Sequence, residues 1–450
     1  MEGVAVNLYY SLLKLKIRLF EGKKVSSYEI ARRISLKRRP KLTNSTMIGV
    51  TGSGAKSTTS ALLYHLLSDN QPSALSFLEN TANRMAARMA NFPKRIRFGV
   101  FEMSGHAAGV IDQACDVVQP DVAIVTVVAG DHRTNFSGAE AIAQEKSVLV
   151  QRAVQRGGIA LLNADDPLVR SMQERAGGKA LLYGEAADAD YRALDVRHSS
   201  EGFLRFVCQH GNERVEFELA LLGRHMLVPA LASIACAHQM GIPLTRLAQR
   251  ARSYAQLPGR CSLHVVERGP TFICDSVKAP FTTLELSFAQ LSLFPNAPRR
   301  TLVLGQVSDY PGAQGDRYRQ IYRLARRYAD RVIVLGHGRL NLKPIPGDLL
   351  GEQLIKVDTV KQLRQLLAES CEPGEIVLLK GSYKVNRMER VVLDHECQVD
   401  CWVERCDKTN SCFDCPELGA DGLARKRPLG LITEADYFEV RGASSSIGRL

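Results

Sequence analysis

Short apolar runs alternate with amphipathic segments along most of this chain. Between residues 46 and 256 the runs predict strands at Met47–Val50, Arg97–Glu102, Val122–Val128 and Ile159–Asn163. The longer segments between them, such as Ala139–Arg156, repeat their apolar positions with helical spacing. This alternation of strand and helix predicts a parallel sheet that is covered by helices on both faces.

The segment Ala255–Gly259 interrupts the pattern, and a second alternating series follows it. Its strands are predicted at Thr271–Asp275, Arg300–Gly305, Arg331–Gly336 and Glu375–Gly381, with helices such as Arg317–Tyr328 between them. We therefore predict an α/β protein with four regions. These are a basic, helical leader at 1–45, a central parallel-sheet domain at 46–256, a Rossmann-like α/β domain at 257–395, and a cysteine-rich tail at 396–450 whose end is disordered.

The leader contains an amphipathic stretch, Val6–Phe20, which we interpret as a helix that docks on the protein itself or contacts a membrane surface. No apolar run reaches the length of a transmembrane span and no signal peptide is found, so we expect a cytoplasmic protein. The 450 residues carry a net charge of +12, which favours anionic ligands. A single Trp and few aromatic residues argue against a stacking platform for nucleic acid.

The first predicted strand runs into a loop of small residues that opens a helix, Thr51-Gly52-Ser53-Gly54-Ala55-Lys56-Ser57-Thr58. Backbone N–H groups of such a loop and helix start bind phosphate, and the lysine reaches the terminal phosphates. Val50 and Ala55 stand where the strict pattern has glycine, and we expect Ala55 to fit only with a negative φ. The alternative is a strand-to-helix turn with one exposed lysine.

Further candidate residues follow the ends of predicted strands, where open α/β sheets bind their ligands. Glu102 suits a metal ion or its water, although a lone carboxylate there also serves as a cap or an ion-pair partner. His132 leaves the next strand and Lys146 lies on the helix that follows; the alternatives are a loop histidine and a solvated lysine. The other segments are Asn163–Asp166, Gly223–His225, Pro258–Arg260 and Ile273–Asp275.

In order and spacing, these segments resemble the Mur ligase family over residues 46 to about 393. That family comprises the ATP-dependent amino-acid ligases of peptidoglycan synthesis and relatives such as cyanophycin, folylpolyglutamate and poly-γ-glutamate synthetases. The resemblance rests on residues 51–59, Phe101-Glu102-Met103-Ser104, the spacing of His132, Phe136, Glu140 and Lys146, Asn163-Ala164-Asp165-Asp166, Pro258-Gly259-Arg260, Asp275, Lys380-Gly381-Ser382 and Met388-Glu389-Arg390.

The resemblance implies that a substrate carboxylate attacks the γ-phosphate of ATP and that an amine then displaces phosphate from the acyl phosphate. It places ATP on Thr51–Thr58, with Lys56 at the terminal phosphates, and on Arg260 and Asp275 from the second domain. It also places one Mg²⁺ on Ser57 and Glu102, and a second on His132 and a carbamate of Lys146. Lys56, His132 and Lys146 are then the catalytic residues, and domain closure completes the site.

Two departures from the family pattern bear on the substrates. The family's G-x-H-N-x-x-N segment reads Gly223-Arg224-His225-Met226-Leu227-Val228-Pro229, so both asparagines are absent and the preference for ATP over GTP stays open. Lys278 replaces the histidine of the family's D-Y-A-H-N-P segment and can meet a phosphate or an acidic substrate.

Peptidoglycan ligases carry an N-terminal domain for a UDP-sugar, and residues 1–45 are too few for one. We therefore expect a peptide, an amino-acid polymer or a small acid as substrate, and the net charge favours an acidic one. One alternative is a nucleotide-binding subunit that has lost ligation and regulates a partner enzyme. Another is a phosphate-loop kinase or ATPase outside the family. A homo-oligomer is equally open.

Five cysteines crowd the tail: Cys397, Cys401, Cys406, Cys412 and Cys415, next to His395. Four thiolates would suit a structural Zn²⁺ in so short a segment. The spacing is irregular and contains one C-x-x-C pair, so free thiols and an iron–sulfur cluster remain alternatives.

Overall fold

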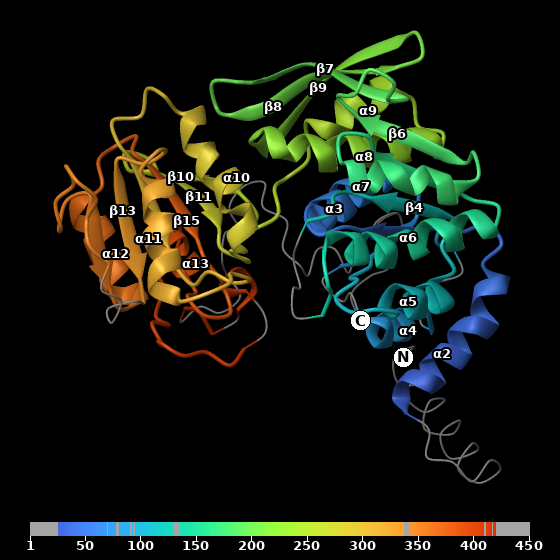
Figure 1. Ribbon diagram of the computed structural model, residues 1–450, viewed down its shortest axis with the longest axis horizontal. Coiled ribbons are helices and arrows are strands. Elements are labelled where there is room, and N and C mark those ends of the chain that lie inside the picture. The colour runs from blue at the N-terminus through green and yellow to red at the C-terminus, as the bar shows by residue number, and fades with distance from the viewer. Residues whose placement is uncertain are drawn as a thin grey trace, which may run out of the picture.

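The structure is a computed structural model that describes residues 26–69, 71–77, 81–90, 92, 95–129, 135–336, 342–408, 411–415 and 417–419. The predicted helix at Val6–Phe20, the candidate ligand His132 and the chain end after residue 419 lie outside these residues. Figure 1 shows two α/β bodies beside one another. We name them the central body, from α2 to α9, and the C-terminal body, from β10 to the end of the described chain.

A nine-stranded sheet forms the central body, in the order β2-β3-β1-β4-β5-β6-β7-β8-β9. Strands β1 to β7 pair in parallel, and β7, β8 and β9 pair antiparallel as two hairpins. The strands are β1 (Thr46–Thr51), β2 (Ser73–Ser76), β3 (Phe98–Glu102), β4 (Val122–Val125), β5 (Ile159–Asn163), β6 (Ala180–Gly184), β7 (Tyr191–His198), β8 (Phe203–His210) and β9 (Glu213–Leu222).

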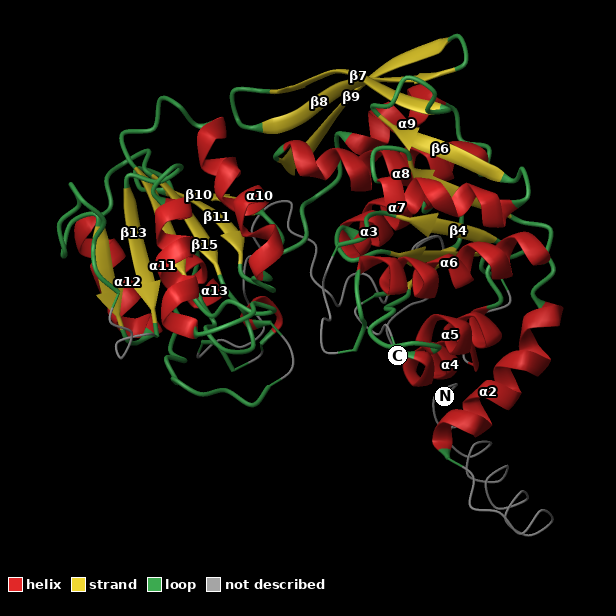
Figure 2. Ribbon diagram, in the orientation of Figure 1, coloured by secondary structure: helices red, strands yellow, loops and turns green. Residues whose placement is uncertain are grey.

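Helices cover both faces of this sheet (Figure 2), because its inner strands are apolar on both sides. Strand β1 shows the alternation: Ile48 and Val50 belong to one apolar cluster, and Met47 belongs to the other. One face carries α3 (Lys56–Leu67), α8 (Leu227–Gln239) and α9 (Leu244–Ala251). The other carries α4 (Ala82–Ala90), α5 (Val110–Val118), α6 (Ala139–Gln155) and the short helices α7 (Pro167–Arg170) and η2 (Ser171–Ala176).

The described part of the predicted leader packs on the central body. Helix α2 (Ser27–Arg38) lies against α4 and α5, and η1 (Arg39–Lys41) follows it. Arg39 is 5% exposed; it donates to the carbonyl of Val118 at 3.2 Å and pairs with Asp121 at 2.6 Å. These contacts to the turn after α5 fix the entry into β1.

A six-stranded sheet forms the C-terminal body, in the order β10-β11-β15-β12-β13-β14. Its strands are β10 (Ser262–Val265), β11 (Thr271–Asp275), β12 (Arg300–Leu304), β13 (Arg331–Leu335), β14 (Leu354–Val357) and β15 (Ile376–Lys380). Only β10 runs antiparallel among these strands. Its helices are η4 (Phe281–Thr283), α10 (Leu284–Phe288), η5 (Ala289–Leu293), α11 (Gln314–Ala325), α12 (Val360–Ser370) and α13 (Glu389–Leu393). The short helix η3 (Arg224–Met226) belongs to the central body, where it precedes α8.

In the part of the tail that the structure describes, up to residue 419, the cysteines do not gather as the predicted zinc ligands. Cys412 and Cys415, in and after η6 (Cys412–Asp414), are buried with Leu393, Val399 and Leu418 in an apolar cluster. Burial raises the pKa of the Cys412 thiol to about 12. Within the described ranges, no three His, Cys, Asp or Glu side chains meet as metal ligands. Apolar packing around Cys412 and Cys415 therefore holds the described part of the tail together.

No helix in the described part of the chain is both long and apolar enough to cross a bilayer.

Candidate functional site

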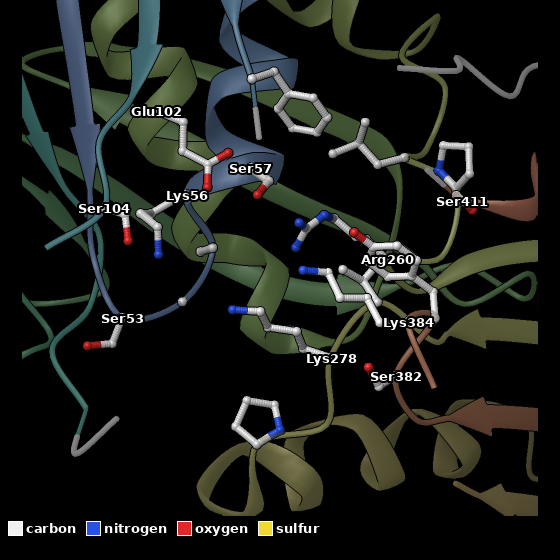
Figure 3. Close-up of a pocket in the computed structure, with 18 of the residues that line it drawn as sticks. Ser53, Lys56, Ser57, Glu102, Ser104, Arg260, Lys278, Ser382, Lys384 and Ser411 are labelled. Atoms are coloured by element: carbon white, nitrogen blue, oxygen red, sulfur yellow. The ribbon is translucent and has the colours of Figure 1, made fainter. Parts of the chain in front are cut away.

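A cleft of about 370 Å³ lies between the two bodies (Figure 3). The central body contributes the loop at Ser53–Ser57 and the end of β3 with Glu102. The linker between the bodies contributes the turn at Pro258–Arg260, and the C-terminal body contributes the segments that follow β11, β12 and β15. The cleft thus lies at the carboxyl ends of parallel strands, as the sequence analysis predicted.

The loop after β1 is held close to the end of β4. A Cβ on Gly52 would lie 1.9 Å from Thr126 Oγ1, so glycine is required there. Thr126 Oγ1 donates to the carbonyl of Gly54 at 2.7 Å, and the N–H of Ser53 donates to the carbonyl of Val127, also at 2.7 Å. These contacts fix the shape of the loop before any ligand binds.

Ala55 overturns one expectation from the sequence. Its φ is +65°, in the left-handed region, where we expected a negative value. This backbone costs a non-glycine residue roughly 1 kcal/mol. It persists because the anchored loop must turn sharply into α3, for which Ala55 is the N-cap residue. The first N–H groups of α3 are thereby presented at the cleft, where they suit a phosphate.

Lys56 and Ser57 are the first two residues of α3, and both line the cleft. The Lys56 ammonium donates to the carbonyl of Gly52 at 2.7 Å, which folds the side chain back over the loop. In Figure 3, Lys56, Ser57 and Glu102 lie together on the wall formed by the central body. The structure thus brings together three residues that the sequence analysis assigned to phosphate and metal binding.

Glu102 ends β3 and is 3% exposed. Its Oε2 atom is buried and has no hydrogen-bond partner among the described residues. A buried carboxylate oxygen without a partner is costly, since it has lost its water and gained nothing. Oxygen ligands of this kind are those that Mg²⁺ prefers, and the Ser57 hydroxyl lies nearby. The residues present therefore fit a magnesium ion.

The remaining predicted catalytic residues do not line the cleft in the described structure. Lys146 is buried on α6, at 1% exposure. Its neighbour Glu145 accepts from the N–H groups of Gly109 at 2.8 Å and Ile111 at 2.7 Å, which fastens α6 to the start of α5. His132 belongs to the residues that the structure does not describe. Thr51, Gly52 and Thr58, predicted to bind nucleotide, support the loop from behind.

Arg260 enters the cleft from the linker between the bodies. Its N–H donates to the carbonyl of Leu257 at 3.1 Å, and the carbonyl of Gly259 accepts from the N–H of Val277 at 3.2 Å. Gly259 has a φ of +71° in this turn. The turn is thus tied to the loop after β11, so that Arg260 moves with the C-terminal body.

Asp275, also predicted to contact nucleotide, is engaged within the C-terminal body. Its Oδ2 accepts from Lys380 Nζ at 2.6 Å and from Ser287 Oγ at 2.5 Å. Burial raises the pKa of Asp275, but the charge and hydrogen bonds of Lys380 and Ser287 outweigh it and lower the pKa below the ordinary value. Asp275 does not line the cleft; the ion pair instead joins the ends of β11 and β15.

His225 of the central body is electrostatically coupled to this pair. Burial lowers the pKa of His225 to about 4, and Asp275 opposes that effect in part. The imidazole is therefore neutral near pH 7.

Two lysines complete the lining of the cleft, and neither is among the predicted catalytic or nucleotide-binding residues. Lys278 stands in place of the family histidine, and Lys384 follows the Lys380-Gly381-Ser382 segment by two residues. Together with Lys56 and Arg260 they outnumber the carboxylates of Glu102 and Asp309 in the lining. Such a surplus of positive charge favours a polyanionic ligand.

Known proteins resemble this chain in sequence and in fold. The family model described as Mur ligase middle domain matches residues 50–237. A UDP-N-acetylmuramoyl-tripeptide--D-alanyl-D-alanine ligase of Bacillus subtilis is 25% identical over 354 residues, which cover 77% of this chain and 75% of that protein. The MurF ligase from Thermotoga maritima in complex with ADP is similar in fold, with a TM-score of 0.67, 22% identity, and coverage of 81% of this chain and 83% of that one. MurF from Acinetobacter baumannii gives a TM-score of 0.71 at 19% identity, covering 82% and 80%.

Proposed function

The chain belongs to the Mur ligase family of ATP-dependent carbon–nitrogen ligases, and on that premise we propose that it joins an amine or amino acid to an acidic substrate that carries no UDP-sugar. The observation that carries the proposal is the buried, unpartnered Oε2 of Glu102 beside Ser57 and Lys56, in a cleft with surplus positive charge.

In the proposed reaction, a carboxylate oxygen of the acid attacks the γ-phosphorus of ATP. The bond from that phosphorus to the bridging oxygen breaks, and ADP leaves. The amine nitrogen then attacks the acyl carbon, phosphate leaves with the bonding electrons, and the nitrogen loses a proton. Phosphoryl transfer of this kind depends mainly on positioning and charge neutralisation.

The residues of the chain take separate parts in this scheme. Lys56 and the N–H groups at the start of α3 hold the terminal phosphates, and Arg260 approaches them from the C-terminal body. Ser57 and Glu102 would hold Mg²⁺, which when bound neutralises phosphate charge. The ion pair of Asp275 and Lys380 supports the loops that carry Lys278 and Lys384.

Lys146 enters the proposal as a residue modified by carbon dioxide. A carbamate would convert its buried cation into an anion with oxygen ligands, and His132 would share the second metal site. Lys146→Ala should then abolish ADP formation, and added bicarbonate should not restore it, because no amine is left to carbamylate. Full activity of this variant would overturn the two-metal assignment.

The acidic substrate is inferred from charge. Magnesium nucleotide accounts for Lys56 and Arg260, whereas Lys278 and Lys384 remain on the facing wall. Two such lysines suit the carboxylates of an acidic peptide or amino-acid polymer.

The test is phosphate release from ATP with Mg²⁺ across pools of amino acids and acidic peptides. Release that requires one acid and one amine would establish the ligase and identify both substrates. Glu102→Gln, which keeps the shape of the side chain, is the matched control and should abolish the signal. Nucleotide binding without release in any pool would contradict the proposal and favour a regulatory subunit.

A further inference from the structure

The cysteine-rich tail has no part in the ligase chemistry above, yet it reaches the cleft. Ser411 lines that cleft together with Tyr383 and Lys384. In Figure 3, Ser411 lies across the cleft from the wall that carries Glu102 and Ser57. A segment outside the motifs of the ligase core therefore contributes surface to the site.

The tail is anchored by a buried arginine. Arg390 is 1% exposed, and its Nη1 donates to the carbonyls of Cys401 at 3.0 Å and Val403 at 2.9 Å. The carbonyl of Leu418 accepts from the N–H groups of Asp400 at 2.9 Å and Cys401 at 3.2 Å. The segment around Asp400 is thus joined to Leu418 by backbone hydrogen bonds, and the carbonyls of Cys401 and Val403 stabilise the buried guanidinium of Arg390.

The tail is also fastened to the second sheet through His264 of β10. The His264 Nδ1 atom lies 3.0 Å from a carboxylate oxygen of Glu396. The His264 ring stacks on Phe413, with ring centroids 5.6 Å apart and an angle of 15° between the planes. Contacts before and after Ser411 therefore fix the tail in place.

Two further contacts fasten the tail directly to the residues behind the cleft. Ser411 Oγ donates to Glu389 Oε1 at 3.3 Å and accepts from the N–H of Phe413 at 3.3 Å. Glu389 is 1% exposed, and its Oε2 has no partner within the described ranges. Arg387 donates to the carbonyl of Lys408 and lies 5.6 Å from the ring centroid of Tyr383. The guanidinium of Arg387 thus contacts both the cleft residue Tyr383 and the backbone of the tail.

We propose that the described part of the tail, residues 396–408, 411–415 and 417–419, is a wall of the substrate end of the cleft, in which Ser411 limits the size of the acid that fits and Glu389 positions Ser411. This inference rests on the proposed function. The occupant is the carboxylate-bearing part of the acid substrate, because Lys384 lines the same cleft as Ser411, whereas the proposed phosphate-binding residues Lys56 and Ser57 lie on the opposite wall.

The test measures binding to the full chain with two probes, L-glutamate and tri-L-glutamate, in the presence of Mg²⁺ and ADP. Ser411→Phe narrows the cleft and should weaken tri-L-glutamate about tenfold, since overpacking costs one or more kcal/mol. The same variant should change L-glutamate and ADP less than about twofold, and Ser411→Ala is the matched control that adds no bulk.

Glu389 is tested by the ratio of the two probe affinities, which a purely structural role would not move. Glu389→Leu removes the acceptor for Ser411 and should shift this ratio about threefold, whereas Glu389→Gln keeps an acceptor and should preserve it. A thermal melt of each variant verifies that it is folded.

Three outcomes would overturn the inference: unchanged binding of tri-L-glutamate to Ser411→Phe, a matching loss of ADP binding, or no tri-L-glutamate binding to the unsubstituted chain. The second outcome would assign the wall to the nucleotide. If the probes respond as expected but no acid and amine pair releases phosphate, the ligase proposal fails and the wall stands.

Discussion

Each of the two bodies has a carboxylate at the end of a parallel strand, Glu102 in the cleft and Asp275 behind its lining, and the two carboxylates differ in how they are paired. Glu102, on the central body, is buried with one oxygen unpartnered among the described residues. Asp275, on the C-terminal body, is saturated by Lys380 and Ser287. The carboxylate of the central body thus keeps an oxygen that a ligand can bind, whereas the carboxylate of the C-terminal body holds the loops of that body together.

Left-handed backbone, in contrast, occurs on both walls, because Asp309 of the C-terminal body also lines the cleft and has a φ of +59°. The left-handed Ala55 lies in the phosphate loop of the central body, next to the residues proposed to bind phosphate. Strain and unpartnered groups of this kind concentrate at functional sites because the surrounding fold maintains them. The comparison suggests that substitutions on the central wall change activity more than stability, and that Asp275 behaves in reverse.

The largest effect is expected for Lys56→Ala. Loss of the ammonium from the terminal phosphates should reduce phosphate release about 100- to 1000-fold, as for other charge-stabilising groups. Unfolding in urea should change little, because the hydrogen bond from Lys56 to the Gly52 carbonyl lies within the same loop. A large loss of stability would break the proposed division between the walls.

The carboxylates themselves give the sharpest contrast. Asp275→Asn leaves Lys380 as a buried charge without its counter-ion and should cost about 3 kcal/mol of unfolding free energy. Glu102→Gln should cost little stability in the absence of Mg²⁺, because the Oε2 atom that it replaces is buried and accepts no hydrogen bond from the described residues. Urea denaturation of both variants measures the difference, and equal losses would refute the comparison.

A pH dependence is expected from His225, which lies where the walls meet. Its pKa is lowered from 6.5 to about 4 by burial, so the unfolded chain binds the proton more readily. The stabilisation is complete above pH 6.5 and is lost as the pH falls toward 4, by at most about 3 kcal/mol. Denaturant titrations across this range should show the slope, and His225→Gln should flatten it relative to the unsubstituted chain.

The smallest effect concerns the strained loop. Ala55→Gly removes the left-handed penalty but makes the unfolded chain more flexible, so a gain of about 0.5 to 1 kcal/mol is expected. Ala55→Val serves as the opposite control, since a β-branched residue tolerates this backbone poorly. If Ala55→Gly destabilised the protein, the strain assigned to the central wall would be wrong.

The inner strands of both sheets could be predicted because each is a short apolar run bounded by turn residues. β11 has the predicted bounds, and β5 does as well. Strands β7 to β9 were not anticipated, because their side chains alternate between buried and exposed and they carry charges such as Arg197 and Glu216. Apolar run length cannot detect such strands, whereas a period of two can.

Some residues of the site could likewise be predicted from the strand pattern, and others could not. Lys56, Ser57 and Glu102 follow strand ends that are close in the fold, so their meeting was predictable from the strand pattern. The pairing of Asp275 with Lys380 was not, because it depends on which strands are neighbours across about a hundred residues of chain. The approach of Ser411 to the cleft depends on packing around Arg390, for which no spacing rule exists.

The position of β15 has a consequence for synthesis. This strand is the last of its sheet in the chain, yet it lies between β11 and β12. Until residues 376–380 leave the ribosome, β11 and β12 have no shared neighbour, and both keep an open edge that can recruit other chains. The C-terminal body therefore closes only after β15 has been synthesised, and a nascent chain that stalls before this point is a natural client for chaperones that shield exposed strands.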